Sequence, residues 1–331
     1  MKIRSGVKFF TLLLFSYLII FFSATYIFDL AKKAYSQLDR KLTVSPAVVD
    51  RTVRKGDSLT FNIKVTNNRN IAKTYYIFAS SFKAGTDESG NPSFSDNDQG
   101  ARSVISWFEF PQKSISLRPG ERKELPVKIN VPANAEAGGH YGAIILSEQN
   151  PGSGQRYVVG VTEEVGTLVL LSLEGLRKEE GKVLDIKPSK YFFTELPVTI
   201  NTRFENTGNV HLKPSGLIEL FNVFGEKEAV LQINAGFNSV LPQSIRKYEN
   251  LWDAPKYFGL FPRIGQYRAE GVVIYGSPEV TQKLAPFYFF LLPKKFILTL
   301  LGGFVIFVLI VYILLKVYKT SIIKSYHKKR K

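Results

Sequence analysis

The chain has 331 residues, no cysteine and a formal net charge of +16 at pH 7. The lack of cysteine excludes disulfides and thiolate metal sites, and the three histidines (His140, His211, His327) are too far apart in sequence for a zinc site. Three cations lie in residues 1–8 and nine in residues 294–331, and removing these twelve leaves +4 for the 285 residues between, which argues against nucleic-acid binding.

The first predicted element is residues 9–28, a run of twenty uncharged residues that follows three cations. This pattern is typical of a secretory signal, and the run is long enough to cross a bilayer if it is not removed. Residues 23–25 are small, but an Ala-x-Ala cleavage motif is absent. For residues 1–38, a cleaved signal peptide and a retained anchor therefore both remain open.

A first β-rich domain is expected over residues 41–176. Residues 59–66 alternate apolar and polar side chains and end at an Asn-Asn-Arg-Asn cluster, the pattern of a half-buried strand that enters a turn. Residues 74–82 and 125–131 continue the series of strands. Between them, residues 83–102 are polar and have no apolar periodicity, which predicts a long loop that is either functional or disordered.

Candidate binding residues lie in this loop and directly after it. Trp107, Phe108 and Phe110 could stack on a sugar ring or anchor a protein partner, although alternation also predicts that at least one of them is a core residue. Asp96 and Asp98 supply carboxylates that calcium could use. No bidentate glutamate follows at the required distance, so a solvated acidic loop is preferred and no metal site is predicted.

A second β-rich domain is expected over residues 180–292. Residues 196–206 alternate and stop at an Asn-Thr-Gly-Asn turn, and residues 217–224 and 229–233 flank a Gly-Glu-Lys turn. Two further apolar segments, 263–275 and 283–292, close the domain. Short strands with turn signals about every ten residues predict a sandwich rather than a βαβ fold.

Two landmarks recur in both domains. An asparagine ends the alternating strand (Asn67, Asn206), and a Gly-x-Tyr segment follows later, GHYGA in one domain and GQYRA in the other. In immunoglobulin-like sandwiches a tyrosine near the start of the penultimate strand donates a hydrogen bond to an upstream carbonyl. We therefore expect Tyr141 and Tyr267 to be structural tyrosine corners, with two tyrosines that merely face the core as the alternative.

Residues 296–315 form a second uncharged run of twenty residues, the length of a transmembrane helix. Seven cations follow this run in residues 316–331, whereas only Lys294 and Lys295 precede it closely. The positive-inside rule then predicts a cytoplasmic tail over 316–331 and places both β-rich domains on the outer side of the cell membrane.

Several short motifs accompany this organisation: Val44-Ser45-Pro46-Ala47, Asn67, Leu117-Arg118-Pro119-Gly120, Gly139-x-Tyr141-Gly142-x-Ile144, Asn206-x-Gly208-Asn209 and Pro214-x-Gly216. With them the chain resembles the WxL-interacting surface proteins of Gram-positive bacteria over essentially its whole length. The resemblance implies a signal peptide, a peptidoglycan-binding sandwich, a partner-binding sandwich, a transmembrane helix and a basic tail. It carries over no ligand-binding residue and rests on a likeness of fold.

No catalytic constellation or cofactor is predicted. Residues 80–83 match S-x-x-K and residues 95–97 match S-D-N, but the two motifs are too close together and no K-T-G is present. The Gly-Ser-Gly at 152–154 lacks the third glycine of a dinucleotide loop.

The sequence therefore predicts an all-β protein with two tandem immunoglobulin-like β-sandwiches, an N-terminal signal or anchor and a C-terminal transmembrane helix. The predicted function is non-catalytic binding of cell-wall polymer (peptidoglycan) or of another surface protein, with lipid contact through residues 296–315. A chaperone-like or accessory subunit of a surface assembly, using an exposed strand edge, is the alternative. An enzyme is a minor one.

Overall fold

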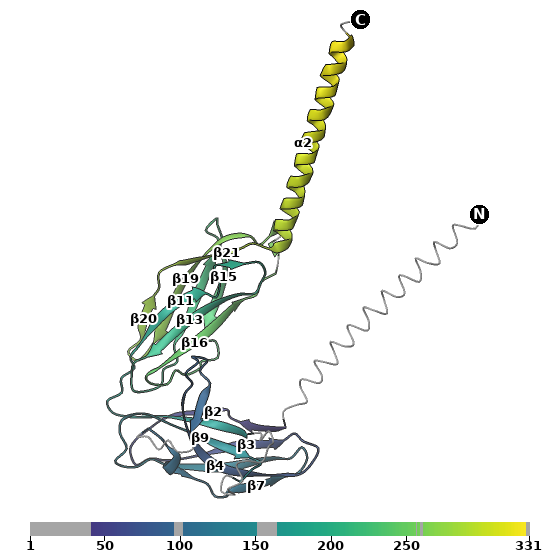
Figure 1. Cartoon of the computed structure of the whole chain (residues 1–331). Coiled ribbons are helices and arrows are strands. Elements are labelled where there is room, and N and C mark those ends of the chain that lie inside the picture. Colours follow the sequence, from purple (N-terminus) through teal and green to yellow (C-terminus); the bar gives the residue numbers. More distant parts are fainter. Residues whose placement is uncertain (1–40, 96–101, 151–163, 256, 259–260, 329–331) are drawn as a thin grey trace, which may run out of the picture. The chain divides into compact units, whose positions relative to one another are not determined.

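The computed structural model describes residues 41–95, 102–150, 164–255, 257–258 and 261–328 (Figure 1). The predicted signal or anchor segment (1–38) lies outside the described residues, as do Asp96, Asp98 and the last three residues of the tail. The described chain is mainly β-strand with one long C-terminal helix, and the prediction of two immunoglobulin-like β-sandwiches is confirmed.

The chain forms two compact units. Unit 1 contains the described residues of Met1–Ser81, Ser95–Ala135 and Tyr141–Leu171, and unit 2 contains those of Phe82–Phe94, Glu136–His140 and Ser172–Lys331. Two short segments from the first half of the chain therefore belong to unit 2.

Unit 1 is a sandwich of two mainly antiparallel sheets. One sheet has the order β1–β3–β8–β6 and the other β2–β10–β9–β4–β5, with β7 paired to β4. The expected alternation holds in β8, where Leu125, Val127 and Ile129 are fully buried and the residues between them face outward. The strands of these two sheets are β1 Leu42–Ser45, β2 Val48–Val53, β3 Ser58–Asn67, β4 Lys73–Ala84, β5 Pro92–Ser95, β6 Phe108–Glu109, β7 Ser114–Leu117, β8 Arg122–Asn130, β9 Gly138–Ser147 and β10 Glu164–Leu173. Most of β5 and one end each of β4, β9 and β10 are among the residues assigned to unit 2.

Unit 2 repeats this plan with a three-stranded sheet, β11–β13–β16, and a six-stranded one, β12–β21–β19–β14–β15, in which β20 also pairs with β19. Its strands are β11 Gly181–Pro188, β12 Phe192–Phe193, β13 Val198–Asn206, β14 Ser215–Phe221, β15 Lys227–Ile233, β16 Ser244–Trp252, β17 Tyr257–Phe258, β18 Phe261–Pro262, β19 Gly265–Tyr275, β20 Val280–Lys283 and β21 Phe287–Leu291. Strands β17 and β18 form a small hairpin between β16 and β19.

An aromatic stack fills the core of unit 2. The rings of Tyr267 and Phe289 are stacked with centroids 5.5 Å apart, and Trp252 meets Tyr267 edge-on at 4.9 Å. Tyr267 and Phe289 are paired positions of the β19–β21 ladder, so their stacked rings form a cross-strand contact between the two strands. Buried aromatic pairs of this geometry contribute about 0.5–1.5 kcal/mol beyond the area that they bury.

The recurring asparagines have a common structural role. Each is fully buried at the end of the third strand of its sandwich, β3 or β13. The Nδ2 of Asn67 donates to the carbonyls of Ile71, Leu117 and Arg118 at 2.9–3.2 Å, and its Oδ1 accepts from the amide of Arg69. One side chain thus joins its own turn to the distant segment that leads from β7 to β8.

Asn206 makes the corresponding contacts in unit 2. Its Nδ2 donates to the carbonyls of Val210 and Val240 at 2.7 and 2.8 Å, and its Oδ1 accepts from the amide of Gly208 at 2.9 Å. In both units the partners are a carbonyl four residues on, an amide two residues on and a distant carbonyl. An amide side chain suits this place because it both donates and accepts.

The Gly-x-Tyr segments start the strands predicted for them. Tyr141 and Tyr267 are buried near the beginnings of β9 and β19, and burial raises the pKa of Tyr267. Their role as tyrosine corners, which requires a hydrogen bond from the hydroxyl, stays a prediction.

The prediction of a structureless loop over residues 83–102 is wrong for the part that the structure describes. Strand β4 continues to Ala84, β5 covers Pro92–Ser95, and the amide of Gly85 donates to the carbonyl of Asn91 at 3.0 Å. Asp87 closes the turn because its Oδ1 accepts from the amide and the hydroxyl of Ser89. The sequence did not predict this hairpin, because its polar residues lack the alternation of apolar side chains by which strands are recognised.

Helix α2 (Lys294–Lys328) begins three residues after β21. An 18-residue window within its segment Lys294–Lys316 has a mean hydropathy of 2.9 and is not buried, and the segment is long and apolar enough to cross a membrane. A 23-residue helix is about 34 Å long, against a hydrocarbon core of about 30 Å.

We expect Asn67→Ala and Asn206→Ala each to lower the free energy of unfolding by about 3 kcal/mol, because several buried backbone groups lose their partner. Trp107 lies in unit 1 and Trp252 in unit 2, and the chain has no other tryptophan. Denaturant unfolding of the full chain in detergent, followed by fluorescence in Trp107→Phe and Trp252→Phe backgrounds, would report each unit separately.

Asn62→Ala is the matched control for Asn67, because Asn62 lies on the same strand and its side chain donates to the exposed Glu124. Its effect should stay below about 0.5 kcal/mol. Equal losses for Asn62 and Asn67, or a loss in the wrong unit, would contradict the assigned role.

The tyrosine-corner hypothesis predicts that Tyr141→Phe and Tyr267→Phe each cost about 1 kcal/mol, the net contribution of one hydrogen bond. Phenylalanine preserves the stack of residue 267 on Phe289, so ring packing alone predicts no change. The same fluorescence measurement distinguishes the tyrosine-corner hypothesis from ring packing alone. An unchanged free energy of unfolding in both variants would show that the tyrosines act only as core residues.

Candidate functional site

Of the aromatic residues predicted to bind a ligand in unit 1, one is buried and two are partly exposed, and their binding role stays a prediction. Trp107 ends a short 3₁₀ helix and is 7% exposed, so its ring does not face a ligand in solvent. Phe108 and Phe110 are half-buried and stacked with centroids 5.6 Å apart. A Cβ at Gly142 would lie 2.6 Å from Val104 and 3.2 Å from Phe108, so this cluster packs closely on β9.

The acidic residues provide no site that can be described. Asp96 and Asp98 lie outside the described residues. Within the described ranges, no group of three or more His, Asp or Glu residues is placed to hold a metal ion.

The turn of the β4–β5 hairpin is instead part of a charged row within unit 2. Arg203 of β13 donates to both carboxylate oxygens of Glu88, through Nε at 2.7 Å and Nη2 at 2.5 Å, and contacts Asp185 of β11 at 3.3 Å. The amide of Lys247 on β16 donates to the carbonyl of Glu88 at 2.8 Å. Asp185, Arg203 and Lys247 face one another across the three strands, so Glu88 binds one cross-strand row.

The ion pair with Arg203 outweighs burial in its effect on the pKa of Glu88. The bidentate hydrogen bonds from Arg203 hold the pKa of the Glu88 carboxyl below its ordinary value, and burial opposes this only in part. The φ of +78° at Gly90 lies in the left-handed region that favours glycine. A Cβ there would also lie 2.2 Å from the guanidinium of Arg246, which would have to move.

A second, more exposed feature of unit 2 is the outward side of its six-stranded sheet. We call it the aromatic face and define it by Phe192, Leu217, Phe221, Val230, Tyr288 and Phe290. The register places these residues on one side, since Phe192 pairs with Phe290, Phe221 and Tyr288 both pair with Arg268, and Val230 pairs with Glu219 of the outward row. The core residues Tyr267, Ala269 and Phe289 alternate with them and point the other way.

Two aromatic residues of this face contact each other while one of them remains largely accessible. Phe192 and Phe290 are stacked, with centroids 5.1 Å apart and planes 13° from parallel, and Phe192 is 63% exposed. Tyr288 is 47% exposed. The amide of Phe290 donates to the carbonyl of Tyr191 at 2.8 Å, which fixes the backbone of β12 beside β21.

Charged residues surround the aromatic face in pairs. The guanidinium of Arg268 lies 4.5 Å from the ring centre of Phe221 and is paired with Glu270. Lys227 pairs with Glu219 at 2.6 Å and lies 6.0 Å from the same ring. Aromatic and arginine side chains in a polar surround are the composition of protein-binding surfaces.

Runs of consecutive aromatic residues in the sequence indicate this face, although the pattern of alternating apolar residues does not include them. Residues 191–193 read Tyr-Phe-Phe and residues 287–290 read Phe-Tyr-Phe-Phe. Because neighbouring residues of a strand point to opposite sides, consecutive aromatics cannot all enter the core.

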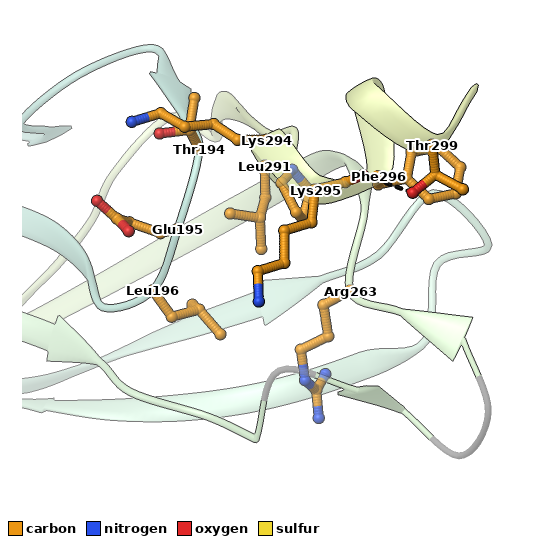
Figure 2. Close-up of a pocket in the computed structure, with 10 residues that line it drawn as sticks. Thr194, Glu195, Leu196, Arg263, Leu291, Lys294, Lys295, Phe296 and Thr299 are labelled. Carbon is orange, nitrogen blue, oxygen red and sulfur yellow. Dashed lines mark hydrogen bonds between the residues drawn. The ribbon is translucent and has the colours of Figure 1, made fainter. Parts of the chain in front are cut away.

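A cavity of about 440 Å³ lies where the sandwich of unit 2 meets α2 (Figure 2). Figure 2 shows the side chain of Lys295 projecting from the start of the helix toward the space between Leu196 and Arg263, while Lys294 extends on the side of Thr194. The lining residues are Thr194, Glu195, Leu196, Arg263, Leu291, Pro293, Lys294, Lys295, Phe296 and Thr299.

No protein-family model matches the chain, and no curated protein does. Solved structures with some similarity include the class 5 fimbriae chaperone CfaA, 12% identical over 74% of this chain and 100% of that chain, with a TM-score of 0.35. The YadV chaperone is 10% identical over 74% of this chain and 100% of that chain, with a TM-score of 0.36. The CsuC–CsuE chaperone–tip adhesion subunit complex of Acinetobacter baumannii is 9% identical over 73% of this chain and 97% of that chain, with a TM-score of 0.34. Similarity at this level assigns no function.

We expect Glu88→Gln to loosen the hairpin turn, because the charge-assisted pair becomes a weaker neutral one. The wild-type contact should be complete above the ordinary carboxyl pKa of 4.5 and should be lost as the pH falls through the lowered folded value. Hydrogen exchange of residues 86–91, corrected for intrinsic rates, should therefore speed up on acidification in the wild type and be already fast and less pH-dependent in the variant.

Glu249→Gln is the control, because Glu249 forms an ion pair with Lys247 at 3.0 Å on the same row of strands. It should leave exchange in 86–91 unchanged. Unaltered exchange in Glu88→Gln at neutral pH would show that the turn does not depend on the ion pair.

Proposed function

We propose that the protein is a non-catalytic, membrane-anchored surface protein that binds another protein through the aromatic face of unit 2. The observation that carries the proposal is the cluster of Phe192, Phe221, Tyr288 and Phe290 on the solvent side of a sheet whose other side already forms the core. Burying such side chains stabilises a complex by roughly 25 cal/mol per Å² of apolar surface.

The kind of partner follows from chain connectivity. Strand β21 ends at Leu291 and α2 begins at Lys294, so Phe290 is four residues from the apolar helix, at most about 14 Å of extended chain. If α2 crosses the membrane, the aromatic face is tethered close to the bilayer surface. A protein held at that same surface meets it at high effective concentration.

The charge distribution supports the orientation that we propose. The segment after the apolar run carries seven cations, against Lys294 and Lys295 before it, so the tail is cytoplasmic and both sandwiches face outward. Binding of another surface protein is also the role that the resemblance to WxL-interacting proteins implies for the second sandwich. Its peptidoglycan-binding role would fall to unit 1, where we assign no ligand residue because Trp107 is in the core.

A photo-crosslinking side chain at position 266 would test the proposal in intact cells. Gln266 is exposed and directly opposite Phe290, so it reports on the aromatic face. We expect a discrete protein adduct whose yield falls at least fivefold in Phe192→Ser/Phe290→Ser, because the stacked pair is removed. Protease added outside the cells should digest the sandwich part of the adduct.

Leu251 provides the matched control. It is 58% exposed on β16 of the other sheet, and Leu251→Ser should leave the adduct unchanged. An adduct that survives the double serine variant, or that forms equally from position 251, would refute the assignment of the face. An adduct that external protease cannot reach would refute the outward orientation.

A further inference from the structure

We propose that the cavity between the sandwich of unit 2 and α2 binds a phosphate-bearing headgroup of an anionic membrane lipid. The site is separate from the aromatic face and depends only on α2 crossing a bilayer. Its volume, about 440 Å³, is in the range of small-molecule sites and suits a glycerophosphate headgroup with the start of its acyl chains.

The depth of the cavity is the first argument. Phe296 and Thr299 line it and belong to the apolar segment Lys294–Lys316, whereas Glu195 and Arg263 belong to the sandwich. Thr299 is five residues into the helix, about 7 Å along its axis. The headgroup layer of one leaflet is about 5–7 Å thick. The cavity therefore spans the layer in which lipid phosphates lie.

The charge of the lining is the second argument. Arg263 already has a carboxylate partner, Glu228, and its Nε donates to the carbonyl of Pro255 at 3.0 Å. In the described part of the chain neither Lys294 nor Lys295 is held in an ion pair, and both residues line a cavity with one carboxylate, Glu195. An anion would offset the excess positive charge.

The arrangement of polar and apolar groups is the third argument. Lys295 projects into the cavity from the helix, and the hydroxyl of Thr194 lies on the sandwich side (Figure 2). The hydroxyl of Thr299 donates to the carbonyl of Lys295 at 2.7 Å, and Thr299 also lines the cavity. The apolar part of the lining consists of Leu196, Leu291, Pro293 and Phe296. A phosphate at the cations and a glycerol backbone on the apolar wall would satisfy both parts.

Native mass spectrometry of the full chain in detergent, titrated with phosphatidylglycerol or phosphatidylcholine, would test the proposal. We expect one phosphatidylglycerol to bind at least tenfold more tightly than phosphatidylcholine. Lys294→Gln/Lys295→Gln should weaken phosphatidylglycerol at least tenfold and leave phosphatidylcholine unchanged. The control Lys316→Gln/Lys319→Gln removes two cations from the other end of the apolar segment and should retain the tight site.

Thr194→Trp separates a defined cavity from diffuse attraction, because it fills the space without altering charge. Thr194 is exposed, so the fold should tolerate the change, which circular dichroism would verify. We expect the tight phosphatidylglycerol site to disappear. Retention of that site in Thr194→Trp, or equal affinity for the two lipids in the wild type, would overturn the proposal.

Glycerol 3-phosphate is the arm that distinguishes a lipid from a soluble phosphate ester. At a concentration equal to that of phosphatidylglycerol, it should displace little of the lipid, because it lacks the acyl chains that contact Phe296 and Leu291. Displacement at equal concentration would identify a soluble phosphate ester as the ligand and overturn the assignment to lipid.

Discussion

A buried asparagine at the end of the third strand is the interaction on which each sandwich depends. At that point the chain leaves its sheet, and the carbonyls of two or three segments converge where water is excluded. Asn67 and Asn206 supply the missing donors and accept an amide in return, each with no exposed surface. A buried backbone group without a partner costs about 1–3 kcal/mol, so few other side chains could end this strand. The same solution in both units explains why the sequence repeats there.

The six-stranded sheet of unit 2 has two different sides with different consequences. On the inner side, Tyr267, Phe289 and Trp252 form a stack that holds β19, β21 and β16 together. On the outer side, the pairing of β12 with β21 places Phe192 beside Phe290, and the pairing of β19 with β21 places Arg268 beside Tyr288. Solvent reaches the side chains on this side. The inner side accounts for stability and the outer side does not need to be aromatic for the fold. That surplus is the physical basis for assigning the outer side to a partner.

The short connection between β21 and α2 relates these features to the membrane. Only two residues separate the last strand from a helix of membrane-spanning length, so the aromatic face and the cavity lined by Lys294 and Lys295 lie close to where the helix would enter a bilayer. A protein partner at the face and a lipid headgroup in the cavity could bind together, because the two sites offer different chemical groups. The face offers exposed apolar rings, whereas the cavity offers Lys294 and Lys295, neither of which is held in an ion pair within the described residues.

The sequence alone determined the class of the fold, because period-two alternation and turn clusters are local, and an apolar run of twenty residues needs no neighbour to be recognised. It also located Asn67 and Asn206, but not their partners, since Leu117 and Val240 are 50 and 34 residues away. Only the tertiary structure decided which aromatics are surface residues: Trp107 is in the core, whereas Phe192 and Phe290 meet on an outer face through a parallel pairing of strands about 100 residues apart. It also turned a polar stretch into a hairpin whose Glu88 finds Arg203, 115 residues on. Composition cannot reveal such contacts, because they depend on which strands the folded chain places side by side.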